Sequence, residues 1–189
     1  MKMWLNVAAV SLMAAAQPET RLELNAPGPL TAILGTHRVP VAKQALGAWV
    51  LDDGMTVAYA ARDGAGGFEN QGQALYLYDL RTNRRRKILS ETFLIDGVQE
   101  AKTSAGKKAL LVDMHDGGLG ADHVAVADPL RGEVLRVERA RIIRVEGDSI
   151  EVGLYRPEDV DRKDAQPYKT ERYDLKELLK RPVITAGAR

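Results

Sequence analysis

The chain has 189 residues, with 27 lysines and arginines against 26 aspartates and glutamates, so its formal net charge is +1 at pH 7. This balance argues against a nucleic-acid partner, because nucleic-acid binders usually carry a basic excess or a basic stripe. The chain has no cysteine, which excludes disulfide bonds and thiolate metal sites, and its length is typical of one domain.

The N-terminus has the features of a secretory signal. Lys2 precedes a short apolar stretch, and Ala14 and Ala16 supply the small residues of an Ala-x-Ala cleavage pattern. A first core helix or a membrane anchor is the alternative, but the stretch is shorter than the roughly 20 residues that span a bilayer. No later segment is long and apolar enough for a transmembrane segment. We therefore expect residues 1–16 to be a signal peptide and the mature protein to be periplasmic or secreted.

Residues 17–46 form an N-terminal segment with a mixed pattern. Residues 21–24 alternate between polar and apolar side chains, residues 30–34 are mostly apolar, and proline and glycine residues lie between them. We expect short strands here, which either belong to a degenerate fourth unit or close a ring of sheets.

Tight hairpins recur through residues 47–189. The pair Asp53-Gly54 separates an apolar run from the strand-like residues 55–60. Such a pair predicts a β-hairpin, because glycine tolerates the positive φ that the tight turn requires. Gly106 and Gly147 stand at corresponding turns later in the chain.

Three aspartates mark an internal repeat. Asp79, Asp128 and Asp174 each follow a strand-like run and precede a turn, and they are 49 and 46 residues apart. A period of roughly 40–50 residues with several strands per unit is typical of propeller arrays. We therefore expect an all-β fold, a propeller-like array of antiparallel four-stranded blades with three clear repeats. Within residues 173–180 the leucines fit helical spacing, so a short helix is the alternative to a blade strand there.

The residue pattern of the first repeat resembles the TolB-type propeller blade, which is related to WD-repeat blades. The resemblance rests on Trp49, Asp53-Gly54 and residues 57–59, followed by residues 75–83. That family typically reads Trp-Ser-Pro-Asp-Gly, whereas here three residues, 50–52, replace the Ser-Pro pair. The resemblance implies the fold, and the functions of such blades differ widely between members.

Three long polar loops occupy equivalent places in the repeats, at residues 61–73, 113–123 and 156–167. Because antiparallel strands alternate in direction, we expect equivalent loops of stacked units to lie at one end. Binding sites are often built on long loops of a rigid scaffold. Tolerated surface insertions are the alternative interpretation.

The second loop holds two of the three histidines and three carboxylates. The candidate ligand-binding residues are Asp113, His115, Asp116, Asp122 and His123. Imidazole and carboxylate groups on one loop can bind a divalent cation. The spacing matches no established metal motif, and a solvated connection between strands is the alternative. We therefore expect no cofactor, and we leave the identity of any metal open.

The basic run at residues 84–87 is predicted to lie on the outermost strand of its blade. Charged edge strands discourage aggregation between sheets, and this interpretation is preferred to the binding of anionic lipid headgroups.

The sequence favours a binding role over catalysis. Within it we find no nucleophile elbow, zinc-binding helix motif or phosphate-binding loop. We expect an exported, non-catalytic binding or scaffold module of the cell envelope, with an envelope protein or an extracellular ligand held by the long loops. The alternative is a cation-dependent hydrolase or lyase with its site near residues 113–123. A homo-oligomer in which two copies complete one ring is also consistent with the repeat count.

Overall fold

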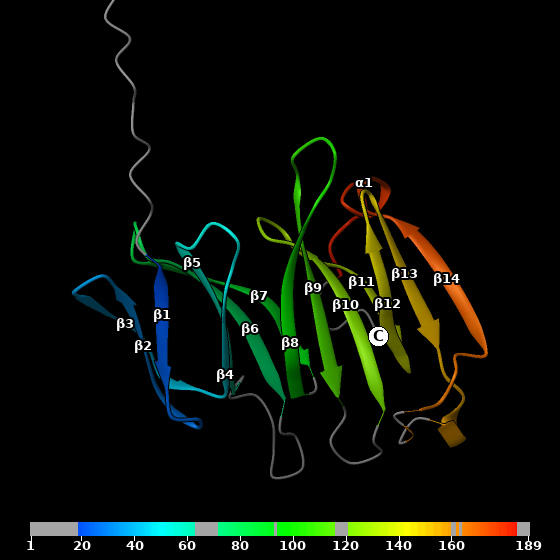
Figure 1. The fold of residues 1–189 in the computed structure, drawn as a ribbon, viewed down its shortest axis with the longest axis horizontal. Helices are drawn as coiled ribbons and strands as arrows, with labels where there is room; N and C mark the ends of the chain where they lie inside the picture. The colour runs from blue at the N-terminus through cyan, green and yellow to red at the C-terminus, as the bar shows by residue number, and fades with distance from the viewer. Residues whose placement is uncertain are drawn as a thin grey trace, which may run out of the picture.

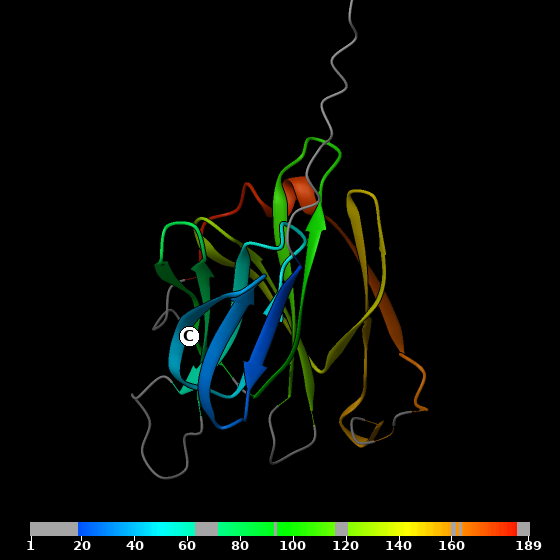
Figure 2. The same ribbon diagram turned by 60° about the vertical axis from the view of Figure 1, so that its left-hand side comes forward.

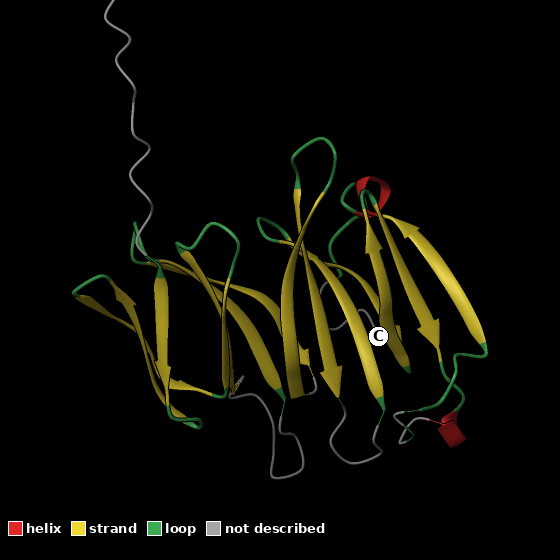
Figure 3. Ribbon diagram, in the orientation of Figure 1, coloured by secondary structure: helices red, strands yellow, loops and turns green. Residues whose placement is uncertain are grey.

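The computed structural model describes residues 19–62, 72–92, 94–115, 121–159, 162 and 164–184. Residues 1–16, the expected signal peptide, lie outside them. Strands dominate the described residues, with two short helical segments near the C-terminal end (Figure 3). These segments are η1 (Pro157–Asp159) and α1 (Leu175–Leu178). In this part of the chain no helix is long and apolar enough to span a membrane.

The strands form four antiparallel sheets, each made of consecutive strands. The first sheet contains β1 (Thr20–Leu24), β2 (Gly28–Leu34) and β3 (His37–Ala45). The second contains β4 (Gly47–Val50), β5 (Thr56–Arg62), β6 (Gln73–Asp79) and β7 (Arg84–Thr92). The third contains β8 (Leu94–Lys102), β9 (Lys108–His115), β10 (Asp122–Asp128) and β11 (Gly132–Glu138). The fourth contains β12 (Ala140–Glu146), β13 (Ser149–Leu154) and β14 (Lys169–Asp174).

The four sheets stand side by side in a row that runs from β1 to β14 (Figure 1). Figure 1 places the first and fourth sheets at opposite ends of this row, and Figure 2 brings the first sheet toward the viewer. Within the described residues no strand ladder joins these two sheets, so the ring of blades is open. The all-β, propeller-like prediction is confirmed, and the N-terminal strands supply the fourth unit.

The two outer sheets each have three strands, and the connections show which position is absent. Leu46 alone separates β3 from β4, and Arg139 alone separates β11 from β12. The strand β3 therefore corresponds to β11, the last strand of a complete sheet. By the same count, β12 to β14 correspond to the first three strands of a sheet. The described part of the row thus begins at a second strand and ends at a third.

Apolar side chains fill the three interfaces between neighbouring sheets. Leu30 and Tyr59 lie between the first two sheets, Leu110 between the second and third, and Leu111 between the third and fourth. Successive strand residues point to opposite faces, so the neighbours Leu110 and Leu111 serve different cores. Each is fully buried, which typically contributes about 1.5–3 kcal/mol.

Charged side chains stand on the outer faces of the row, together with a few exposed apolar side chains such as Ile143 of β12, which is 48% exposed. Leu22 and Leu24 pack inward on β1, while Glu23 between them faces outward and pairs with Arg38. At the other end, Glu151 alternates with the buried residues of β13. Terminal units of repeat proteins need such polar faces to stay soluble. These faces contrast with the three apolar interfaces inside the row.

The repeated turns are confirmed in detail. Gly54, Gly106 and Gly147 all adopt positive φ, between 56° and 75°, at the first turn of their sheets. Asp79 accepts hydrogen bonds from the backbone N–H groups of Arg81 and Thr82, at 2.8 and 3.3 Å. The equivalent aspartates make the same kind of contact with the next turn.

The third repeat aspartate begins a short helix, the alternative that the sequence left open in place of a strand. Asp174 is the N-cap of α1 and accepts hydrogen bonds from the backbone N–H groups of Lys176 and Glu177, at 2.7 and 3.3 Å. Leu175 and Leu178 bury their side chains in the core between the third and fourth sheets. The helix therefore stands where a complete sheet would turn into its fourth strand. The basic run lies on β7, an edge strand of the second sheet, as predicted.

Candidate binding surface at the tight-turn end

The row of sheets has two different ends. The tight turns at Gly54, Gly106 and Gly147 lie at one end, which we call the turn end (Figure 1). Thr20, the first residue of β1, donates its hydroxyl hydrogen bond to the Gly54 carbonyl oxygen and so joins the first sheet to the second there. The other end, the loop end, is where β5, β9 and β13 finish.

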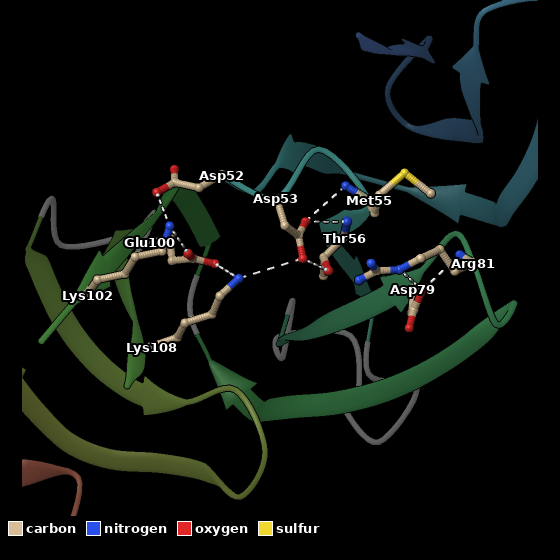
Figure 4. Close-up of polar contacts among 9 residues, drawn as sticks. All are labelled: Asp52, Asp53, Met55, Thr56, Asp79, Arg81, Glu100, Lys102 and Lys108. Carbon is tan, nitrogen blue, oxygen red and sulfur yellow. Dashed lines mark hydrogen bonds and ion pairs between the residues drawn. The ribbon is translucent and has the colours of Figure 1, made fainter. Parts of the chain in front are cut away.

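A network of five charged side chains joins the second and third sheets at the turn end (Figure 4). Lys102 and Lys108 face each other across the ladder of β8 and β9, a placement that is destabilising for like charges. Glu100 lies between them, with its carboxylate oxygens 3.4 Å from the Lys102 Nζ and 2.9 Å from the Lys108 Nζ. Its side chain is only 1% exposed.

Two aspartates of the neighbouring sheet complete this network. The Asp52 carboxylate is 3.4 Å from the Lys102 Nζ, and the Asp53 carboxylate is 3.6 Å from the Lys108 Nζ. The two lysines are therefore surrounded by carboxylates from both sheets. This arrangement offsets the repulsion between them and orients Lys108 toward the space between the sheets.

Asp53 also holds its own turn. Its carboxylate accepts hydrogen bonds from the backbone N–H groups of Met55 and Thr56, at 2.9 and 2.8 Å, and from the Thr56 hydroxyl at 2.8 Å (Figure 4). Burial acts to raise the pKa of Asp53, but these hydrogen bonds and the nearby Lys108 together lower it. The carboxylate is thus kept ionised within a rigid turn.

A first hollow of about 570 Å³ opens beside this network, between the second and third sheets. Its lining combines acids and bases from both sheets with a few apolar side chains. The lining residues are Leu51, Asp53, Thr56, Leu77, Asp79, Thr82, Arg84, Arg85, Arg86, Glu100, Lys108, Pro129 and Leu130.

A second hollow of about 760 Å³ adjoins it, between the third sheet and the end of α1. Lys107, Lys108, Arg131 and Lys180 line this hollow, and Asp128 is the one acid among its lining residues. The remaining lining residues are Gly106, Pro129, Leu130 and Leu179.

Leu130 belongs to both hollows and is 73% exposed, the most exposed large apolar side chain of the described residues. The turn that carries it is held in place. Asp128 accepts a hydrogen bond from the Leu130 backbone N–H at 2.8 Å, and Arg86 Nη1 donates to the Leu130 carbonyl oxygen at 2.9 Å. The exposure of this leucine is therefore a property of an ordered turn.

Arg131, which lines the second hollow, makes hydrogen bonds to residues on two sides of it. Its Nε donates to the Asp128 carboxylate at 2.7 Å, and its Nη1 donates to the Arg181 carbonyl oxygen at 3.2 Å. A further donation goes to the Leu179 carbonyl oxygen. These contacts tie the segment after α1 to the turn that carries Leu130.

The predicted ligand cluster lies at the loop end and is brought together only in part. Asp113 and His115 lie on β9, and Asp122 lies directly opposite His115 on β10. His123 is opposite Met114, whose side chain belongs to the core between the second and third sheets. Alternation along the strand therefore places His123 on the other face, where it is 5% exposed. Asp116 lies outside the described residues.

Carboxylates crowd the face of the third sheet that looks toward the fourth. Burial, and then the charges of Asp96 and Asp122, raise the pKa of Asp113. Asp122 forms an ion pair with Arg141, which in turn lies over the Tyr155 ring at 4.7 Å from its centroid. Among the described residues, no group of three or more histidine, aspartate and glutamate side chains is placed to hold a metal ion. The proposed cation remains a hypothesis.

The strand ends that flank the three long loops do lie together at the loop end. Gln73, the first residue of β6, accepts a hydrogen bond from the Ile95 backbone N–H at 3.1 Å. The ion pair of Asp122 and Arg141 makes the equivalent connection from β10 to β12. The central loop residues themselves, such as 63–71 and 116–120, lie outside the described residues.

The sequence interpretation did not identify the turn-end surface. Two features of the sequence nevertheless point to this surface. Lys102 and Lys108 flank a predicted hairpin turn symmetrically and so must lie near each other across the ladder. Leu130 stands in a turn otherwise rich in polar and turn-forming residues. Neither feature indicates that residues from a neighbouring sheet complete a hollow.

No protein-family model matches the chain, and a comparison with curated proteins also finds no match. One similar solved structure is the β-propeller domain of the Trilobed protease from Pyrococcus furiosus, described as having an open velcro topology, with a TM-score of 0.48 and 16% identity over 75% of this chain. Another is Pyrococcus horikoshii acylaminoacyl peptidase, with a TM-score of 0.47 and 15% identity over 82% of this chain. The chain spans 43% of the first structure and 29% of the second.

Proposed function

We propose that this chain is an exported, non-catalytic binding module of the cell envelope that holds a protein partner at its turn end. The observation that carries the proposal is the exposed Leu130, which stands on an ordered turn between two hollows. Exposed apolar residues scattered over a surface need no explanation, but one that separates two hollows offers a contact point for a partner. The expected signal peptide supports the envelope setting.

The chemistry of the turn end favours binding over catalysis. A general base works best when its pKa is near the working pH. Asp53 instead has a lowered pKa, because its hydrogen bonds and Lys108 outweigh the opposing effect of burial. The Thr56 hydroxyl beside it already donates to this carboxylate, and Glu100 is paired with two lysines. These groups organise a surface and leave no activated nucleophile among themselves.

A pull-down from envelope extract, with mass spectrometry of the retained proteins, tests the proposal. The mature chain is immobilised beside the variants Leu130→Asp at the turn end and Asp113→Asn at the loop end. We expect the parent and Asp113→Asn to retain the same partner and Leu130→Asp to lose it. Circular dichroism checks that each variant keeps the strand content of the parent, and thermal unfolding checks that each is folded at the temperature of the experiment.

Three results would contradict this proposal. Equal retention of the partner by Leu130→Asp would exclude the turn end as the binding site. Loss of the partner with Asp113→Asn alone would assign the binding site to the loop end. Chelator-sensitive turnover on a panel of hydrolase and lyase substrates, abolished by Asp113→Asn, would instead establish the cation-dependent enzyme.

A further inference from the structure

Resting on the proposed function, we infer that the second hollow binds an acidic, extended peptide segment of the partner, with an apolar side chain of that segment against Leu130. The inference concerns the class of ligand. It follows from the charge and volume of the hollow, from the apolar content of its lining, and from the mixed charge of the neighbouring hollow.

The cations of the second hollow outnumber its acids, and two of them, Lys107 and Lys180, are in no buried ion pair. Arg131 already engages Asp128, and Lys108 engages Glu100 and Asp53. Among the described residues no carboxylate pairs with Lys107, which is exposed.

Lys180 is the second available cation. It pairs with Glu177 at 2.6 Å, but both side chains are more than 60% exposed. Such surface pairs contribute little and exchange easily with other partners. Lys107 and Lys180 therefore provide two positive charges, contributed by the β8–β9 turn and the segment after α1, to receive carboxylates.

The apolar part of the lining is small and local. Leu130 and Pro129 form one side, and Leu179, which is 5% exposed, forms part of the other. A hollow of about 760 Å³ is within the range of about 300–1,000 Å³ that holds small ligands or a few side chains. It fits a leucine-sized side chain flanked by acidic residues better than a large apolar helix.

The adjoining hollow carries charges of both signs. Asp53, Asp79 and Glu100 line it beside Arg84, Arg85, Arg86 and Lys108. A short acidic segment can occupy the second hollow alone, whereas a broad anionic surface would also meet the carboxylates of this hollow. Leu130 is also the one large apolar side chain in the linings that is strongly exposed, which is little for membrane insertion.

Fluorescence anisotropy with defined peptides tests this inference. The probe is a labelled ten-residue peptide with two central leucines flanked by glutamates and aspartates. Its counterpart carries lysines in place of the acids. We expect saturable binding of the acidic probe only, weakened several-fold when the salt concentration rises from about 0.05 M to about 0.5 M, because salt screens exposed charges.

Two double variants with equal changes of charge separate the site from general electrostatics. Lys107→Glu with Lys180→Glu is expected to weaken binding of the acidic probe about tenfold or more. Arg21→Glu with Lys43→Glu, at exposed positions of the first sheet, is the matched control and is expected to change affinity less than about twofold. Thermal unfolding confirms that both double variants fold.

The inference is overturned if the acidic probe does not bind, if the lysine peptide binds equally, or if the two double variants behave alike. Binding to vesicles of phosphatidylserine that depends on Lys107 and Lys180, without peptide binding, would also overturn it. If Leu130→Asp loses the cellular partner while the peptide fails to bind, the proposed function stands and only this inference falls. If Leu130→Asp retains the partner, the proposed function itself falls.

Discussion

Asp148, in the turn between β12 and β13, accepts two hydrogen bonds from Ser104, in the turn between β8 and β9. The Ser104 backbone N–H lies 2.6 Å from one carboxylate oxygen of Asp148, and the hydroxyl lies 2.8 Å from the other. Lys176 of α1 adds an ion pair at 2.7 Å. The third and fourth sheets are therefore joined at the turn end by side chains, as the second and third are by Lys108 and Asp53.

The Asp148 carboxylate predicts a specific dependence of stability on pH. Hydrogen bonding to Lys176, followed by that to Ser104, lowers the pKa of Asp148 from 3.8 to about 2. Because the folded pKa is lower than the unfolded one, this stabilisation is present above pH 3.8 and is lost as the pH falls through 2. We expect Asp148→Asn to lower the Tm at pH 7 and to match the parent near pH 2. The exposed Asp164 gives a control, and an equal loss for Asp164→Asn at pH 7 would contradict the role of Asp148.

The buried carboxylate of Glu100 predicts a larger effect on stability. Glu100→Gln would leave Lys102 and Lys108 facing each other with only the aspartates of the neighbouring sheet to compensate. Removing one partner of a fully buried pair costs about 3–5 kcal/mol. The two lysines are 51% and 37% exposed, so we expect about 1–3 kcal/mol.

Urea unfolding measures this loss, and a second substitution assigns it to charge. Adding Lys102→Gln to Glu100→Gln removes one of the opposed lysines and is expected to recover part of the stability. A loss below about 0.5 kcal/mol for Glu100→Gln would show that the network carries little energy.

The features that could be predicted from the sequence are those that depend on local geometry. Gly54 and Gly106 each stand in a tight turn between two strand-like apolar runs, and such a turn requires positive φ. The repeat aspartate Asp174 lies where its carboxylate can cap the next backbone N–H groups, and the leucine spacing that follows is compatible with the helix found there. Each of these involves residues only a few positions apart.

The turn-end site could not be predicted because it depends on packing between sheets. Lys102 and Asp52 are 50 residues apart, and only the angle and stagger of two blades bring them together. The strand register also determines which residues of the predicted ligand cluster share a face of the sheet. His123 follows Asp122, the first residue of β10, and that single step places the His123 side chain on the opposite face of the sheet.

The two apolar cores on either side of the third sheet are expected to contribute independently to the free energy of unfolding. Leu111→Ala opens the core between the third and fourth sheets, and Leu75→Ala opens that between the second and third. Each side chain is fully buried, so each variant is expected to lose about 2–5 kcal/mol in urea unfolding. Leu130→Ala, at an exposed position, is the comparison and is expected to change stability by less than about 0.5 kcal/mol. A similar loss for all three would mean that Leu130 is not free at the surface.

Two aspartates of the loop end, Asp113 and Asp122, are expected to change the Tm in opposite directions when each is replaced by asparagine. Burial, and then the charges of Asp96 and Asp122, raise the pKa of Asp113, so the folded state binds a proton more tightly than the unfolded chain does. Stability is therefore lost as the pH rises through the folded pKa, and Asp113→Asn is expected to raise the Tm at pH 7. Its advantage over the parent should shrink as the pH is lowered. Asp122→Asn instead breaks the ion pair with Arg141 and is expected to lower the Tm at pH 7. Calorimetric scans at pH 7 and pH 4 measure both changes, and a lower Tm for both variants at pH 7 would show that Asp113 stabilises the fold as an ionised group.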